Sequence, residues 1–361
     1  MAIDFDRDSA MKILDALEVL SEDAQAGSRY VSEYTSLSLG DQGLINILSS
    51  AHADLATEVN DQMDHIYEYL RTTLSENLAD TFALYARIDD EQRGVLLELE
   101  EYFSAENNMV ERRREAASGE PATGGADGLF TAREDPTSHF VEVTLSSSDS
   151  PESSFSPTGV LDIFSITHFV QTICKFFDRD PIEFLGKKLV GDWESFAKCA
   201  HAFDNLANGV RAIAQNLRDH VDQLEQAWQG NAYAACNSAV YQAANEMVDG
   251  TAVPLESLAE HYREAVEASY QTHKDLEPII KALIDASTGI GLLKTAGKAL
   301  KEGGEVLTKH ADDAAVRISE FQATLQATKS KLNSISGDFA ELKPTTTVPS
   351  VLEELEPHAR N

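Results

Sequence analysis

The feature that most constrains the fold is a stripe of apolar residues spaced three and four apart, which runs along residues 206–283 with one interruption. Residues at this spacing lie on one face of an α-helix, so each half of the stripe predicts a long amphipathic helix. The interruption contains Gly230 and Asn231, residue types that adopt the backbone conformations found where helices end. The sequence therefore predicts a helical hairpin with a tight corner at Trp228–Gly230. The stripe comprises Leu206, Val210, Ile213, Leu217, Val221, Leu224 and Trp228 before the corner, and Ala235, Ala239, Ala243, Met247, Leu255, Leu258, Tyr262, Ala265, Ser269, Leu276, Ile279 and Leu283 after it.

The first part of the chain predicts another hairpin. Apolar spacing indicates one helix over residues 4–36, with Asp6 or Asp8 supplying the acidic start that helix N-termini favour. A turn-rich stretch follows, and a second, very long helix is predicted from residue 44 to about residue 114. This hairpin has no Trp at its bend.

The corner of the later hairpin resembles that of a known superfamily. A W-x-G tripeptide with a Leu four residues before it, small residues after it and a long helix on each side is similar to the WXG superfamily of helical-hairpin proteins secreted by type VII (ESX-like) systems. The similarity covers about residues 190–285. In the first hairpin, Tyr85 and Asp89 are four apart and share one helical face. Y-x-x-x-D/E is the pattern that type VII substrates carry beyond a hairpin, so the first hundred residues resemble EspC-type secreted proteins or the PE half of PE–PPE pairs.

The resemblance implies a fused pair of the EspB or PE–PPE kind, carrying a composite export signal in one chain. In that signal Trp228 and Gly230 of one hairpin lie near Tyr85 and Asp89 of the other, and Trp228 is partly exposed as a recognition handle. The implied partner is a type VII secretion ATPase or a chaperone. The resemblance also implies that the protein is cytoplasmic before export and is afterwards extracellular or held in the cell envelope. The chain lacks the Pro-Glu and Pro-Pro-Glu starts of PE and PPE proteins, so the similarity is to the broader superfamily. The competing interpretation is that Trp228 is only a core anchor of a helical bundle.

The expected fold is all-α: two antiparallel long-helix hairpins pair as a four-helix bundle, followed by a C-terminal helix or coiled coil. Five segments are expected: residues 1–115 as the first hairpin, 116–158 as a flexible linker, 159–285 as the WXG-type hairpin, 286–343 as amphipathic and heptad helices, and 344–361 as a loose tail. The linker is rich in Gly, Ser, Pro and acidic residues, which bury too little apolar surface to order a chain. Within it, His139–Leu145 alternates like a short strand that has no partner.

Two C-terminal segments leave alternatives open. Residues 311–342 keep a seven-residue apolar repeat, which predicts a coiled-coil seam whose partner is either internal or a second copy of the chain. Residues 286–310 combine Lys with Gly and small apolar residues. They are read either as a membrane-touching amphipathic helix or as a connector helix packed on the bundle, and the connector is the preferred reading. A self-assembling scaffold and a membrane-active effector are therefore the alternative functions.

Composition disfavours several other classes. The net charge of −32 repels nucleic acid and anionic lipid. The three Cys have no metal-site spacing, and Cys199 and Cys236 are expected to be buried. The sequence has no H-E-x-x-H, nucleotide-loop or G-x-S-x-G motif, so we expect no enzyme, no cofactor and no metal. We also expect neither a Sec signal peptide nor a spanning helix, so export would depend on folded structure.

Overall fold

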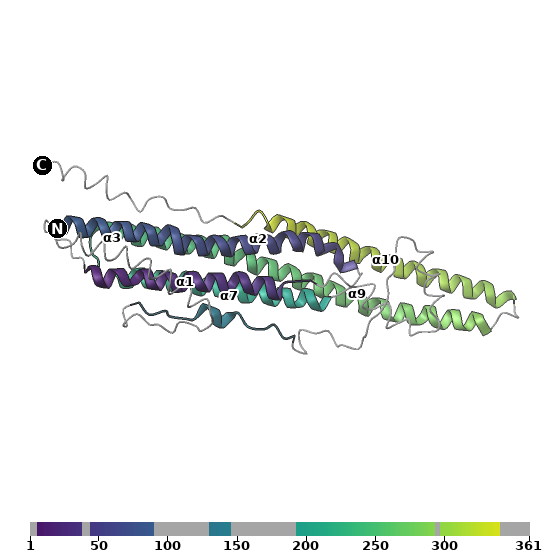
Figure 1. The fold of residues 1–361 in the computed structure, drawn as a ribbon. Helices are drawn as coiled ribbons and strands as arrows, with labels where there is room; N and C mark the ends of the chain where they lie inside the picture. The colour runs from purple at the N-terminus through teal and green to yellow at the C-terminus, as the bar shows by residue number, and fades with distance from the viewer. Residues whose placement is uncertain (1–5, 38–43, 90–129, 146–192, 293–296, 340–361) are drawn as a thin grey trace.

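The computed structural model describes residues 6–37, 44–89, 130–145, 193–292 and 297–339. Every regular element among these residues is helical, and none of them forms a β-strand. Figure 1 shows long helices lying side by side along a common direction. The predicted all-α class is therefore confirmed for the described part of the chain.

The first hairpin begins with α1 (Arg7–Tyr34), close to the helix predicted over residues 4–36. Asp6 is its N-cap, and its carboxylate accepts a hydrogen bond from the Ser9 N–H at 3.3 Å. The return rod is assembled from the 3₁₀ turn η1 (Leu44–Leu48), α2 (Ser49–Glu68), the π-helical η2 (Tyr69–Leu74) and α3 (Ser75–Asp89). The predicted continuation of this rod to about residue 114 lies outside the described residues.

The second hairpin has the same plan. Its outgoing helix is α7 (Trp193–Leu224), and its return rod joins α8 (Asn231–Met247), the π-helical η4 (Val248–Ala252) and α9 (Val253–Leu292). One detail of the predicted stripe is wrong. In the first half of α8 the buried residues are Tyr233, Cys236 and Val240, whereas the predicted Ala235 and Ala239 are only half-buried. Further along the helix, Ala243 and Met247 are buried as predicted.

The two hairpins share one apolar core. The helix α1 packs against α2 within its own hairpin and against α7 of the other, while α7 packs against α8 and α9. The aliphatic and aromatic faces of these helices form a continuous buried cluster. Its fully buried members include Ile13, Leu17 and Leu20 of α1, Leu55 and Met63 of α2, Phe203, Leu206, Val210 and Ile213 of α7, and Leu255, Leu258 and Tyr262 of α9.

The heptad stripe lies on α10 (Gly297–Ile335), which packs along α9 and also contacts η1 and α2. Its buried residues are Ala314, Ile318, Phe321, Leu325, Thr328, Leu332 and Ile335, followed by Phe339 just beyond the helix. At its edges Lys331 Nζ donates to Glu264 of α9 at 2.8 Å, and Ser336 Oγ donates to Glu58 of α2 at 2.5 Å. Of the two partners considered for this seam, the internal one is present. Figure 1 shows the α9–α10 pair extending beyond the other helices.

Residues 130–145 require a correction, because they lie within the expected flexible linker yet pack against α1 and α7. We call this segment the strap. It contains the short 3₁₀ turn η3 (Pro136–His139), and residues 139–145, which alternate like a strand, form none. Phe130 and Pro136 are buried, and Asp135 caps the turn by accepting from the Thr137 N–H at 2.9 Å. These anchors give the strap the apolar burial that composition alone did not reveal. The rest of the expected linker lies outside the described residues.

Among the residues that the structure describes, no helix is both long and apolar enough to cross a membrane.

Candidate functional site

The W-x-G corner connects α7 to α8 in a compact turn. The N–H groups of Ala227 and Trp228 both donate to the Leu224 carbonyl at 2.9 Å, which closes the last turn of α7. Gly230 then has φ +116°, a backbone conformation that side chains with a Cβ rarely adopt, and it is the residue before α8 begins. The predicted corner at Trp228–Gly230 is therefore present, and its glycine is required by backbone geometry.

Trp228 is fully buried, with 0% of its surface exposed. Its ring meets Tyr233 of α8 edge-on, with the ring centroids 6.1 Å apart, and the Tyr233 hydroxyl donates to the Val221 carbonyl of α7 at 3.2 Å. The expectation of a partly exposed Trp handle is therefore wrong. An indole is large and mostly apolar, so placing it beneath the corner removes more surface from water than exposing it.

The corner also contacts the first and the last helix of the first hairpin, at the start of α1 and in α3. The Asp6 N–H, at the start of α1, donates to the Ala227 carbonyl at 2.7 Å. The Trp228 ring meets Phe82 of α3 at 5.5 Å and 86°, an edge-to-face arrangement typical of favourable aromatic pairs. Tyr85 lies three residues after Phe82 in α3, and Asp89 is the last residue of that helix. The side chains of Tyr85 and Asp89 lie outside the described residues.

The outer surface of the corner is polar and small. Gln229, Gly230 and Asn231 are exposed, as are Glu225 and Gln226 just before them. No atom lies within 4 Å of the position that a Cβ on Gly230 would take, so the surface is open there. The part of the W-x-G motif that another molecule can contact is therefore the backbone and the short side chains around Gly230.

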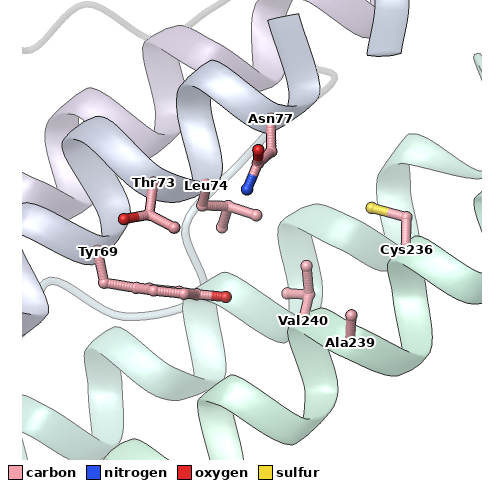
Figure 2. A pocket seen from close by; sticks show the side chains of 7 residues that line it. All are labelled: Tyr69, Thr73, Leu74, Asn77, Cys236, Ala239 and Val240. Atoms are coloured by element: carbon pink, nitrogen blue, oxygen red, sulfur yellow. The ribbon is translucent and has the colours of Figure 1, made fainter. Parts of the chain in front are cut away.

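A small cavity lies between the hairpins, next to the π-helical turn η2. Figure 2 shows Tyr69, Thr73, Leu74 and Asn77 of the first hairpin facing Cys236, Ala239 and Val240 of α8. Turns of this type often accompany functional sites, but this cavity has a volume of about 10 Å³. That is space for a single water molecule and not for a metabolite.

Burial holds one cysteine and two histidines of the core in their uncharged forms. Burial raises the pKa of the Cys236 thiol to about 12, which removes the thiolate needed for nucleophilic chemistry. Burial also lowers the pKa values of His52 and His220 to about 4, so both rings are neutral at pH 7. The described ranges contain no cluster of His, Cys, Asp or Glu that could hold a metal ion. Cys199 is buried, as expected.

Sequence reasoning did not identify every residue that builds this end of the molecule. Neither Phe82, within the long helix predicted from residue 44, nor Tyr233 was among the predicted site residues. The cue for Phe82 is its position one helical turn before Tyr85, on the same rod. The bond from Asp6 to the corner has no sequence signal, because it joins main-chain atoms that are far apart in the chain.

Comparison of the chain with protein-family models, curated protein sequences and solved structures gives no match.

Proposed function

We propose that this chain is a non-enzymatic substrate of a type VII (ESX-like) secretion system, or a protein associated with one, and that it carries both halves of its export signal. The W-x-G corner at Trp228 and Gly230 supplies one half, and the α3 segment with Tyr85 and Asp89 supplies the other. The partner is the secretion ATPase or a chaperone. The protein is cytoplasmic before export and secreted afterwards.

The observation that supports this proposal most strongly is the contact between Trp228 and Phe82, with ring centroids 5.5 Å apart. It joins the corner of one hairpin to the terminal part of α3, within one turn of Tyr85. Two separate sequence signals therefore belong to the same end of the molecule. A composite signal requires this proximity, because a single partner must reach both halves at once.

The burial of Trp228 changes the role we assign to it. We infer that Trp228 is the anchor that fixes the corner against α3, while the recognised surface consists of the exposed backbone at Gly230 and the α3 turns that carry Tyr85 and Asp89. We further infer that α1, the α2–α3 rod, α7 and the α8–α9 rod form a four-helix bundle in which a covalent connection replaces the second chain of a two-chain pair. Such a connection gives a millimolar effective concentration, so the hairpins need little intrinsic affinity.

The test of this function is an immunoblot of culture supernatant and cell lysate, from the native host with and without its type VII ATPase. We expect the chain in the supernatant of the parent strain and in the lysate of the ATPase-deficient strain. A cytoplasmic marker protein in the same fractions controls for lysis. Equal amounts of the chain in both supernatants would refute the proposal.

The alternatives have less support. The heptad residues of α10 that the structure describes are covered by α9 and α2, so self-assembly through this seam would require α10 to leave its own bundle. The membrane-active reading depends on residues 286–310, most of whose side chains lie outside the described residues.

A further inference from the structure

Two side-chain amides on α7 bind the main chain of the strap. Asn216 Oδ1 accepts from the N–H groups of Arg133 at 2.9 Å and Glu134 at 3.3 Å, and its Nδ2 donates to the Glu134 carbonyl at 2.6 Å. Seven residues along α7, Gln223 Oε1 accepts from the Thr131 N–H at 3.0 Å, and Nε2 donates to the Thr131 carbonyl at 3.4 Å. Each amide thus satisfies both a donor and an acceptor of an extended backbone, as in recognition of a peptide main chain.

Phe140, in the later part of the strap, occupies a space that exists because two glycines of the neighbouring helices have no side chain. We call this space the seat. A Cβ on Gly209 of α7 would lie 2.3 Å from the Phe140 ring, and one on Gly27 of α1 would lie 3.3 Å from it. Tyr30 of α1 stacks on Phe140 with centroids 5.4 Å apart, and its hydroxyl donates to the Val141 carbonyl at 3.0 Å. The two glycines therefore provide the space for Phe140 between two helices of different hairpins.

The remaining contacts define the direction in which the strap runs along α7 and the distance between its buried residues. Phe130 is 5% exposed and meets the His220 ring at 6.1 Å, and Pro136 is buried. The strap runs antiparallel to α7, because Thr131 pairs with Gln223 whereas Phe140 lies at Gly209. Residues 131–135 are exposed between the anchors. Binding therefore depends on a few apolar anchors and on main-chain hydrogen bonds, with little contribution from the other side chains.

We propose that α1 and α7 form a peptide-binding groove, that residues 130–145 are its ligand, and that this ligand can leave the groove and bind it in trans while the helices stay folded. The class of ligand is an extended peptide with two Phe residues ten positions apart and a Pro between them. In the intact chain the groove is occupied by the chain's own strap. Because the strap contacts α1 and α7 together, its occupancy joins the two hairpins. This inference does not depend on the proposed role in secretion.

The first test uses Gly209→Ala. In a helix interior this change ordinarily increases stability, because Ala is a better helix former. Here the new Cβ takes the space of the Phe140 ring, so we expect release of the strap instead. Limited trypsin digestion reports the release, since Arg133 lies in the strap beside Asn216. We expect cleavage after Arg133 to become at least tenfold faster, with an unchanged thermal unfolding midpoint of the helices. Unchanged cleavage, or loss of the helices together with the strap, would overturn the proposal.

A double-mutant cycle separates release from general damage. In a Phe140→Ala background the seat is empty, so adding Gly209→Ala should raise the thermal unfolding midpoint rather than expose Arg133 further. A cycle in which Gly209→Ala has the same effect in both backgrounds would show that Phe140 and Gly209 are independent, and would contradict the groove.

The second test supplies the ligand in trans. The full chain with Phe130→Ala and Phe140→Ala is titrated against a fluorescent peptide of residues 130–145, and binding is followed by anisotropy. We expect a dissociation constant in the micromolar range. Binding should weaken at least tenfold when Gly209→Ala is added to the protein, and likewise when both Phe residues of the peptide are replaced by Ala. No binding, or binding insensitive to these changes, would show that the strap is an integral part of the fold and not a ligand.

Discussion

The two hairpins are fixed at their bends by different chemistry. At the bend of the second hairpin, Trp228 lies between Phe82 and Tyr233, and its contacts are aromatic. At the C-terminal end of α1, where the first hairpin turns, the fixing group is His52 of α2, which bonds both the Thr35 carbonyl and Tyr262 of α9. The contrast teaches that these bends respond to different perturbations: one depends on packed volume and the other on protonation.

The polar bend is a buried network with a defined tautomer. His52 Nε2 donates to the Thr35 carbonyl at 2.7 Å, so its Nδ1 is the acceptor, and the Tyr262 hydroxyl donates to it at 2.5 Å. The Cys199 thiol donates to the same carbonyl at 3.6 Å. Burial lowers the pKa of His52 to about 4, because a charged imidazolium would lose its hydration there.

The largest effect is expected at the aromatic bend. Trp228→Ala removes a fully buried ring and leaves a cavity between α3 and α8, so the free energy of unfolding should fall by about 3–5 kcal/mol. Trp228→Phe keeps part of the volume and should cost clearly less. Urea denaturation of both variants measures the difference, and equal stability of the Ala variant and the parent would contradict the anchor role.

The next effect belongs to the polar bend and depends on pH. The folded pKa of His52, about 4, lies below the ordinary 6.5, so its contribution to stability is complete above about pH 6.5 and is lost as pH falls toward 4. This loss amounts to about 3 kcal/mol. His52→Gln should therefore reduce the difference in unfolding free energy between pH 7 and pH 4 by about that amount. The pKa of His220 is also lowered, so the His52→Gln variant should still lose some stability in acid. An unchanged pH difference in His52→Gln would contradict a neutral buried ring.

A smaller effect is expected at Gly230, where a substitution adds backbone strain to the W-x-G corner without changing side-chain packing. Gly230→Ala places a Cβ on a residue with φ +116° although the space around it is open, so only backbone strain is added. We expect destabilisation of about 2 kcal/mol. Gly337→Ala is the matched control, because its Cβ would meet its nearest neighbour, the Ser334 carbonyl oxygen, at an ordinary 3.4 Å. If thermal unfolding midpoints of the two variants agreed, the corner would not require glycine.

The smallest effect is expected at Asp23, whose contribution to stability falls as pH rises, whereas that of His52 falls as pH decreases. The pKa of Asp23 on α1 is raised to about 7, first by burial and then by the negative charges of Asp135 and Glu22. Its folded pKa lies above the ordinary 3.8, so stability is greatest below about pH 4 and declines as pH rises through 7. Asp23→Asn should therefore stabilise the protein by about 1 kcal/mol at pH 8, less than the pKa implies because an amide must also be desolvated. Guanidinium titrations at pH 8 and pH 5 should show this gain only at pH 8.

Regular features of the sequence predicted much of the fold. The stripe spacing located α1, α7 and α10, and Gly230 located the corner, because these signals are local and repeat along one helix. The buried positions in the first half of α8 were missed since Ala235 and Ala239 are small residues that fit a half-buried face as well as a buried one. Apolar periodicity does not identify polar residues that are buried beside an apolar stripe. Asn216, which is 0% exposed and binds the strap, is one of them.

The candidate site was only partly predictable, for a related reason. W-x-G and Y-x-x-x-D are local patterns, so the sequence displays them separately, whereas the contact of Trp228 with Phe82 depends on how two hairpins pack. The burial of Trp228 follows from the same packing. The strap was missed because its composition favours disorder, while the groove that orders it belongs to distant helices.

The decisive measurement concerns Tyr85, because the composite signal requires it although the W-x-G corner is left intact. Export of Tyr85→Ala is quantified as the supernatant-to-lysate ratio in the native host and compared with the parent chain. Ser330→Ala, at an exposed position on α10, is the matched control. Thermal unfolding of each purified chain verifies that it folds. We predict that Tyr85→Ala remains folded and loses at least nine-tenths of its export, while the control is exported normally. Normal export of folded Tyr85→Ala would contradict a signal shared between the two hairpins.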